Sequence, residues 1–223
     1  MVDSAIELLD SGNDAPSVAV IAKAAGVPRS VVYRLFGSRE DLEESIRVSI
    51  IDGLMTELAP ALEPSDSIRS LIHEATTTYV GWVAVHPDLH RFLTATSASA
   101  SHGEHPMSTA GSQAVERTKQ LIASNLAGIA AVAIQAGSPK QEVATLSAHD
   151  TATYLADALV GIFDTVVNRW ISSHPQASAQ DAVIGFLSSA ACGMVGAAAR
   201  TAGVKVNLDR PLHLRDFGFT GIQ

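Results

Sequence analysis

Four side chains between residues 29 and 34 have the chemistry and the spacing to contact a nucleic acid. Arg29, Ser30, Tyr33 and Arg34 stand at positions i, i+1, i+4 and i+5, so they share one side of a helix. An arginine can donate two hydrogen bonds to guanine O6 and N7, with a discrimination of about 1–3 kcal/mol. Serine and tyrosine hydroxyls suit phosphate oxygens. The pattern therefore indicates a surface that could read a duplex.

The elements that must position these side chains are two short helices and a tight turn. Ser17 can cap a helix over 18–25, and Gly26 suits the left-handed position at its end. Pro28 fits the first turn of a helix over 29–36. Such a pair forms a helix-turn-helix unit, whose second helix enters the major groove of DNA. The competing interpretation is an ordinary amphipathic pair with a solvated charged face.

An apolar side of the second helix should pack on the first. We expect these contacts between Val31, Val32, Leu35 and Phe36 on one side and Ile21, Ala22 and Ala25 on the other. After Gly37, Ser38 opens a further helix with Asp41 three residues on, which is typical of a capping box.

Bulk composition restricts how the chain could bind DNA. The formal net charge is −8, and residues 1–50 carry five basic against eight acidic side chains. Contact with a nucleic acid must therefore depend on local placement of charge rather than on a general positive field. Hydrophobic residues make up 47% of the chain, enough for a sizeable core. We expect the single cysteine, Cys192, to be buried and reduced.

Helical periodicity predominates along the chain and predicts an all-α fold. We expect about nine helices, over 2–9, 18–25, 29–36, 38–58, 66–85, 87–98, 113–137, 145–173 and 178–200. The predicted domains are 1–47 for DNA binding and 48–200 for ligand binding and dimerisation, followed by a tail over 201–223. No secretion leader or membrane span is evident, which predicts a cytoplasmic protein.

The block IAKAAGVPRSVVYRLFGSREDL, residues 21–42, resembles the helix-turn-helix signature of the tetracycline-repressor (TetR) family of bacterial regulators. The resemblance extends from Ala5 to about Ile46 and includes the run AIELL, the block over 17–27, Tyr33, Phe36 and the segment over 38–42. It implies three helices and a linking fourth, followed by divergent helices that bind a small molecule and dimerise.

The resemblance also implies roles for single residues. It suggests base or groove contacts from Arg29, Ser30 and Arg34, and phosphate contacts from Ser17, Tyr33 and Arg39. Three features depart from the family pattern. The chain starts at Met1-Val2-Asp3 where the family often has a basic arm, Pro28 replaces a capping Ser or Thr, and Leu35 replaces Tyr or His. Either the native chain begins upstream of Met1, or its affinity for DNA is weaker. Leu35 predicts one phosphate contact fewer.

The C-terminal helices carry the candidate dimer interface. Ser189, Gly193 and Ala197 are spaced four apart, as are Cys192 and Gly196, and small residues at this spacing let helices approach closely. The four residues that we assign to the interface are Ser189, Gly193, Gly196 and Ala197. Packing within one subunit is the competing interpretation. A two-fold dimer would place two recognition helices about 34 Å apart on a near-palindromic site.

A ligand pocket is expected to be mostly apolar with a few polar groups. The candidate residues are His73, Tyr79, Trp82, Phe92, Tyr154 and Phe163. Simple core packing could explain each of them. Their composition predicts a small hydrophobic or aromatic effector rather than a sugar or a nucleotide.

The histidines do not predict a metal site. His102 and His105 flank Glu104 in a Ser/Gly-rich stretch, and Pro87 interrupts the helix that would align His86 with His90. No G-x-S-x-G elbow, phosphate-binding glycine loop or H-E-x-x-H motif is present. We therefore predict no metal, no cofactor and no enzymatic activity.

Together these features predict a homodimeric transcriptional regulator, most simply a repressor that releases a near-palindromic operator when its effector binds. The effector would move the helix over 66–85 and, through the helix over 38–58, change the spacing of the recognition helices. Only a ligand that distinguishes the two spacings could do so. The alternative is a helical ligand-binding or adaptor protein whose DNA-binding module has decayed, which the acidic N-terminal segment favours.

Overall fold

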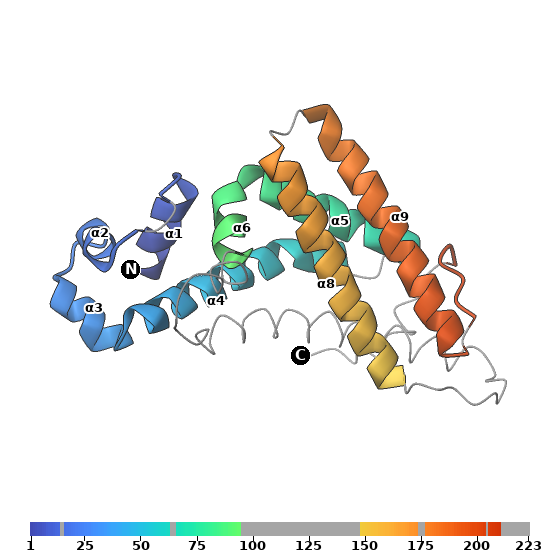
Figure 1. The fold of residues 1–223 in the computed structure, drawn as a ribbon, viewed down its shortest axis with the longest axis horizontal. Coiled ribbons are helices and arrows are strands. Elements are labelled where there is room, and N and C mark those ends of the chain that lie inside the picture. Colours follow the sequence, from blue (N-terminus) through green and yellow to red (C-terminus); the bar gives the residue numbers. More distant parts are fainter. Residues whose placement is uncertain (14–15, 63–65, 95–147, 174–176, 204, 211–223) are drawn as a thin grey trace. The chain divides into compact units, whose positions relative to one another are not determined.

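The computed structural model describes residues 1–13, 16–62, 66–94, 148–173, 177–203 and 205–210. Eight α-helices and one 3-10 helix lie within these ranges, which contain no strand, so the predicted all-α fold is confirmed. The helices are α1 Val2–Asp10, α2 Val18–Ala24, α3 Arg29–Phe36, α4 Arg39–Leu58, α5 Ile68–Val85, α6 Pro87–Thr94, α8 Ala148–Ser172 and α9 Ala177–Thr201, with the 3-10 turn η1 over Ala59–Leu62 (Figure 1). The helix predicted over 113–137 lies outside the described residues.

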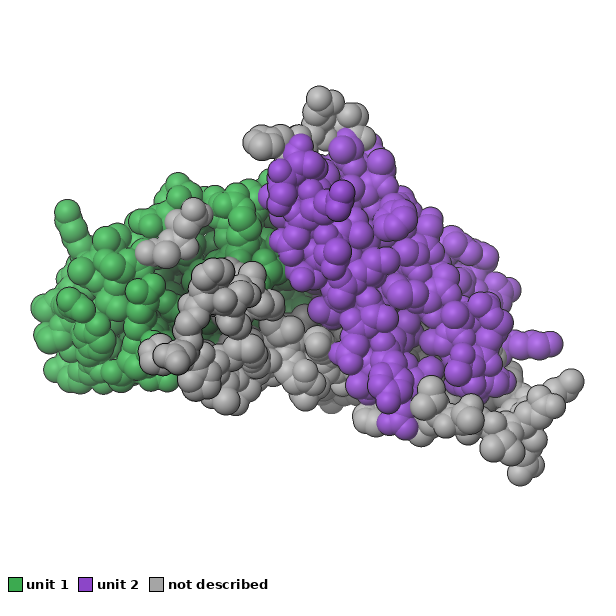
Figure 2. All heavy atoms as spheres, viewed as in Figure 1, with its two compact units in different colours: residues 1–56, 81–117 green, residues 57–80, 118–223 purple. Residues whose placement is uncertain are grey.

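The chain divides into two compact units (Figure 2). Unit 1 consists of residues 1–56 and 81–117, and unit 2 consists of residues 57–80 and 118–223. Helix α5 therefore contributes its first thirteen residues to unit 2 and its last five to unit 1. The domain boundaries predicted from the sequence remain predictions.

The turn that joins α2 to α3 has the predicted local chemistry. Gly26 has φ of +67°, and the helix-ending position requires this left-handed backbone, which side-chain-bearing residues rarely adopt. The Ser17 side chain accepts a hydrogen bond from the backbone N–H of Val20 at 3.4 Å. Pro28 is the N-cap residue of α3, directly before Arg29, and makes no side-chain cap.

Only part of the predicted apolar side of α3 is buried. Val32 is 1% exposed and α3 packs on α2, while Val31 and Phe36 are half-buried. The prediction that Leu35 joins this core is wrong, because its side chain is 63% exposed. Leu35 lies three residues after Val32, on the same side of α3 by helical spacing, so its exposure is set by what packs on the end of the helix and not by periodicity. Its position is on the solvent side of the unit, near the end of α3.

The start of α4 has the expected cap in a modified form. The backbone N–H of Asp41 donates to the Ser38 hydroxyl at 3.0 Å, as predicted. The Asp41 carboxylate accepts from the same hydroxyl at 2.7 Å rather than from the Ser38 backbone. Serine and aspartate thus satisfy one free N–H of the first helical turn.

Helices α1 and α6 pack together within unit 1. His86 lies between α5 and α6, and its Nδ1 is 2.9 Å from each carboxylate oxygen of Asp10 at the end of α1. The His86 ring also lies 5.5 Å from that of Trp82, one turn earlier. Helix α1 is therefore tied to the junction between α5 and α6.

Unit 2 is built on the pairing of α8 with α9. Val167 and Leu187 are fully buried in it, and Trp170 and Cys192 are each 6% exposed. The expectation of a buried cysteine is confirmed. Near the chain end, Arg69 of α5 holds Asp209 through its Nε at 2.6 Å, in a solvent-exposed pair.

His90 in unit 1 predicts a loss of stability in acid. Burial lowers the pKa of His90 from 6.5 to about 4, so the unfolded chain binds more protons between these values. The stability is complete above pH 6.5 and falls as the pH approaches 4. We expect His90→Leu to remove up to about 3 kcal/mol of this fall, measured by urea unfolding across the range. Parallel stability curves for the parent and the variant would contradict the prediction.

Candidate nucleic-acid interface

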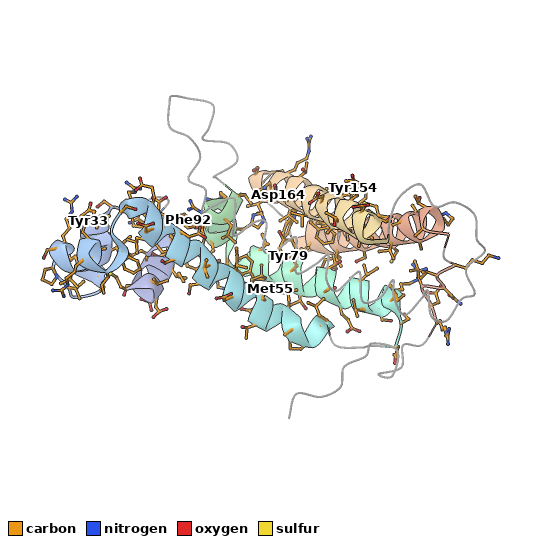
Figure 3. All side chains as sticks on the ribbon, turned by 90° about the horizontal axis from the view of Figure 1, so that it is seen from below. Tyr33, Met55, Tyr79, Phe92, Tyr154 and Asp164 are labelled. Atoms are coloured by element: carbon orange, nitrogen blue, oxygen red, sulfur yellow. The ribbon has the colours of Figure 1, made fainter. Side chains whose placement is uncertain are left out.

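The side chains predicted to read DNA lie together on the solvent side of α3. Arg29, Ser30 and Arg34 are exposed, and Tyr33, labelled in Figure 3, is 38% exposed. Their position follows from the burial of Val32, because the opposite side of the same helix must then face solvent. The predicted separation of a polar outer side from a buried inner position is therefore present in the structure.

Arg29 and Tyr33 form a pair one helical turn apart. Arg29 Nη2 donates to the Tyr33 hydroxyl oxygen at 3.0 Å, and its guanidinium carbon lies 5.3 Å from the tyrosine ring centre. The tyrosine acts as an acceptor in this contact, so its own O–H can still donate to a phosphate oxygen. The other guanidinium N–H groups can donate to a base edge. The pair can thus contact a base edge through Arg29 and a phosphate through Tyr33.

Arg39 is exposed but already has a partner. Its Nε lies 2.7 Å from one carboxylate oxygen of Glu43, and Arg47 lies 3.6 Å from the other. The Arg39 side chain remains 49% exposed, whereas that of Arg47 is 8% exposed and lies over the Phe92 ring at 4.8 Å. An exposed pair of this kind stabilises weakly, so a phosphate can compete for Arg39. Arg47 has a packing role and is not available to DNA.

The local charge of the helix-turn-helix unit differs in sign from that of the whole chain. Residues 16–38 contain Lys23, Arg29 and Arg34 and no aspartate or glutamate, although the chain carries −8 overall. All three cations are exposed. The acidic side chains of the first 50 residues lie before and after this segment, mostly on α1 and α4. A phosphate backbone that approaches α2 and α3 therefore meets positive charge.

The six candidate ligand residues are divided between the two units. Trp82 and Phe92 belong to unit 1, where they contact His86 and Arg47 respectively. The other four, His73, Tyr79, Tyr154 and Phe163, belong to unit 2.

Within unit 2, the structure brings only two of these four aromatic or histidine side chains into ring contact. The rings of Tyr79 and Phe163 are 5.9 Å apart. Tyr154 is 60% exposed, and His73 is an exposed side chain whose Nδ1 lies 3.4 Å from the Ser188 hydroxyl. Among the predicted ligand residues of unit 2, Tyr79 and Phe163 are therefore the two whose rings lie together.

Sequence reasoning missed the polar group beside this aromatic pair. Asp164 follows Phe163 on α8, and its Oδ1 accepts a hydrogen bond from Asn168 Nδ2 at 2.7 Å. Burial raises the pKa of the Asp164 carboxyl, and burial together with the charge of Asp164 raises the pKa of the Tyr79 hydroxyl. A sequence signal existed, since Asp164 is the only charged residue between 158 and 168.

The predicted interface residues lie on a surface stripe of α9. Ser189, Gly193 and Ala197 are exposed and Gly196 is half-exposed. Phe186, on the same side, is 57% exposed. The segment Ala179–Thr201 is apolar and long enough to cross a membrane by these two criteria alone, and 28% of its most apolar window is buried. One side of α9 packs on α8, and the other presents apolar surface.

The described part of the chain contains no group of three or more His, Cys, Asp or Glu side chains suited to a metal ion. His86 contacts Asp10, and His90 is buried. His102, Glu104 and His105 lie outside the described residues. The expectation of no metal and no cofactor therefore stays a prediction.

Residues 2–46 match the family profile of bacterial regulatory proteins of the tetR family. The matched segment contains α1, α2, α3 and the first part of α4, which includes every residue to which we assign a DNA contact. The resemblance inferred from the sequence is confirmed. No curated protein sequence matches the chain.

Several solved structures share the fold. A TetR-like transcriptional regulator from Rhodococcus sp. RHA1 is 20% identical, with a TM-score of 0.56 over 87% of this chain and 93% of that one. A tetR-family transcriptional regulator from Streptomyces coelicolor is 16% identical, with a TM-score of 0.60 over 90% and 85%. The regulator FadR from Bacillus subtilis, in complex with stearoyl-CoA, is 18% identical, with a TM-score of 0.57 over 84% and 96%.

The raised pKa of Asp164 predicts a stabilising substitution. The folded state binds a proton at Asp164 more readily than the unfolded state, so stability falls as the pH rises above 3.8. We expect Asp164→Asn to raise Tm by about 2 °C at pH 7 and by less near pH 4. The amide oxygen can still accept from Asn168. The exposed Asp181→Asn is the matched control, and an equal effect of both substitutions at both pH values would refute this explanation.

Proposed function

We propose that this chain, which belongs to the tetR family by its N-terminal domain, is a DNA-binding transcriptional regulator whose operator affinity responds to a small effector. The observation that carries the proposal is the outer side of α3. There Arg29, Ser30, Tyr33 and Arg34 are exposed in a locally cationic unit without acidic side chains. The family match over residues 2–46 supports the same function.

The proposed division of contacts follows the chemistry of each side chain. Arg29, Ser30 and Arg34 reach base edges in the major groove, and Arg29 is held in place by Tyr33. Tyr33, Arg39 and Ser17 contact phosphates, and these contacts set register and supply the salt-dependent part of the affinity. The contact with Glu43 keeps Arg39 at the start of α4 until a phosphate competes for it.

We propose a homodimer that forms through the exposed stripe of α9. An exposed phenylalanine beside small residues at helical spacing is the surface that a second copy could cover. A two-fold axis would present two α3 helices to a near-palindromic operator. The same arrangement predicts that DNA binding weakens when the dimer dissociates.

The proposed effector is small and mostly apolar, and it binds the helical core of unit 2. Helix α5 supports a route to the DNA, because one continuous helix belongs to unit 2 at its start and to unit 1 at its end. The His86–Asp10 contact then ties the α5–α6 junction to α1. We propose a cytoplasmic, non-enzymatic repressor that leaves its operator when the effector favours the wider spacing of the recognition helices.

Salt dependence tests whether the phosphate contacts exist. We expect the logarithm of the parent's operator affinity to fall linearly with the logarithm of salt concentration, because bound phosphates release counterions. Arg39→Ala should make this slope shallower by about 1.8 for a bound dimer, about 0.9 for each subunit, measured by fluorescence anisotropy on an operator duplex. Arg210→Ala removes an equal charge from unit 2 and should leave the slope unchanged. A parent whose binding is independent of salt would point instead to a decayed DNA-binding module.

The interface proposal predicts a monomer when the α9 stripe carries a bulky cation. A Cβ at Gly193 meets no atom within 4 Å in its own subunit, so Gly193→Arg should fold normally and block only a partner. We expect it to halve the mass measured by light scattering and to weaken operator binding at least tenfold.

Gly53→Arg is the matched control for this variant. Gly53 is also a helical glycine whose Cβ would meet nothing within 4 Å, and it lies on α4. The two substitutions make the same change of helix propensity and charge. A dimeric Gly193→Arg, or a monomeric Gly53→Arg, would refute the assignment of the interface to α9.

A further inference from the structure

One half-buried carboxylate stands among the apolar and aromatic side chains of unit 2. Asp164 on α8 follows Phe163 in the sequence, and the Phe163 ring is 5.9 Å from that of Tyr79 on α5. Figure 3 labels Asp164 and Tyr79. The Oδ1 of Asp164 is held at 2.7 Å by Asn168, one turn along the same helix. The hydrogen bond fixes the orientation of the carboxylate and leaves Oδ2 for another donor.

No cation balances this carboxylate among the residues that the structure describes. The described ion pairs involve Arg39, Arg47, Arg69, His86 and Arg91, and each of these has a partner other than Asp164. A half-buried negative charge without a positive partner destabilises the folded state, and burial correspondingly raises the pKa of Asp164. A cationic ligand would remove that penalty, so it would bind with a gain that no neutral ligand obtains.

From this geometry we infer that Asp164 is the recognition residue for the effector, and that the effector is an apolar or aromatic molecule carrying a protonated amine. The inference rests on the proposed function, because it names the chemistry of that effector. The ammonium N–H donates to the free carboxylate oxygen of Asp164, and the amide of Asn168 holds the carboxylate in place. The rings of Tyr79 and Phe163 contact the apolar body and attract the charge through their faces.

The same geometry disfavours an anionic effector. A carboxylate or phosphate group placed beside Asp164 would meet a like charge in surroundings of low dielectric constant, where repulsion is stronger than in water. FadR from Bacillus subtilis was solved with stearoyl-CoA, so the shared fold accommodates an acyl-CoA in that protein. In this chain the Asp164 carboxylate favours a cationic ligand instead. Binding measurements can therefore separate a cationic effector from an anionic one directly.

The test uses three probes that differ only in their head group: 4-phenylbutylamine, 4-phenylbutanol and 4-phenylbutyrate. We expect calorimetric titration of the parent to give an affinity for the amine at least tenfold above that for the alcohol, with the carboxylate weakest. Asp164→Asn should lose the tenfold preference for the amine while it retains binding of the alcohol. Asp181→Asn makes the same change of net charge on α9 and should keep the parent's order.

Three results would overturn the inference. These are equal or tighter binding of the carboxylate by the parent, an amine preference that survives in Asp164→Asn, and no binding of any probe. A change of dimer mass in Asp164→Asn, without a change in amine preference, would also overturn it, because Asp164 would then serve a second copy of the chain.

Operator release separates this inference from the proposed function. Amine binding that depends on Asp164 but leaves operator affinity unchanged would uphold the recognition residue and contradict the effector response. Release of the operator by the alcohol or the carboxylate, equally in the parent and in Asp164→Asn, would uphold the response and contradict the recognition residue. In each case the operator affinity is measured by anisotropy on the same operator duplex in the presence of each probe.

Discussion

The left-handed turn at Gly26 is the constraint on which the rest of the DNA-binding unit depends. A φ of +67° ends α2 and lets the chain reverse into α3 within a few residues, so that Val32 can be buried while α3 packs on α2. Once Val32 faces inward, helical geometry places Arg29, Ser30, Tyr33 and Arg34 outward. A Cβ at Gly26 would meet no atom within 4 Å, so the space is open. A residue with a side chain would still strain the backbone here, because of the positive φ.

Charge in this protein acts through its placement rather than its total. A chain of net charge −8 can still approach a phosphate backbone, because the segment from 16 to 38 contains lysine and arginine but no aspartate or glutamate. Two further arginines follow on α4 and have different roles. Arg39 is half-exposed in a weak pair with Glu43, whereas Arg47 is buried against Phe92. A count of basic residues would treat the two as equal.

The sequence predicted most of the helices and missed features that depend on tertiary packing. Caps and helix-ending glycines are local signals, and the bounds of α3 and the end of α4 were predicted to the residue. The exposure of Leu35 and the burial of Arg47 depend on what packs around α3 and α4, and periodicity alone does not contain that information. Asp164 was missed because an acidic residue on a long helix usually faces water, and only the fold places it beside Tyr79.

The central claim is that α3 reads a DNA sequence, and a selection of genomic fragments with the purified protein at fixed moderate salt tests it most directly. The parent and an Arg29→Ala/Arg34→Ala double variant would be compared in parallel. Our account predicts that the parent enriches a near-palindromic site and that the double variant, with Val32 and the turn intact, does not. Enrichment of the same site by both proteins, or of no site by the parent, would contradict it.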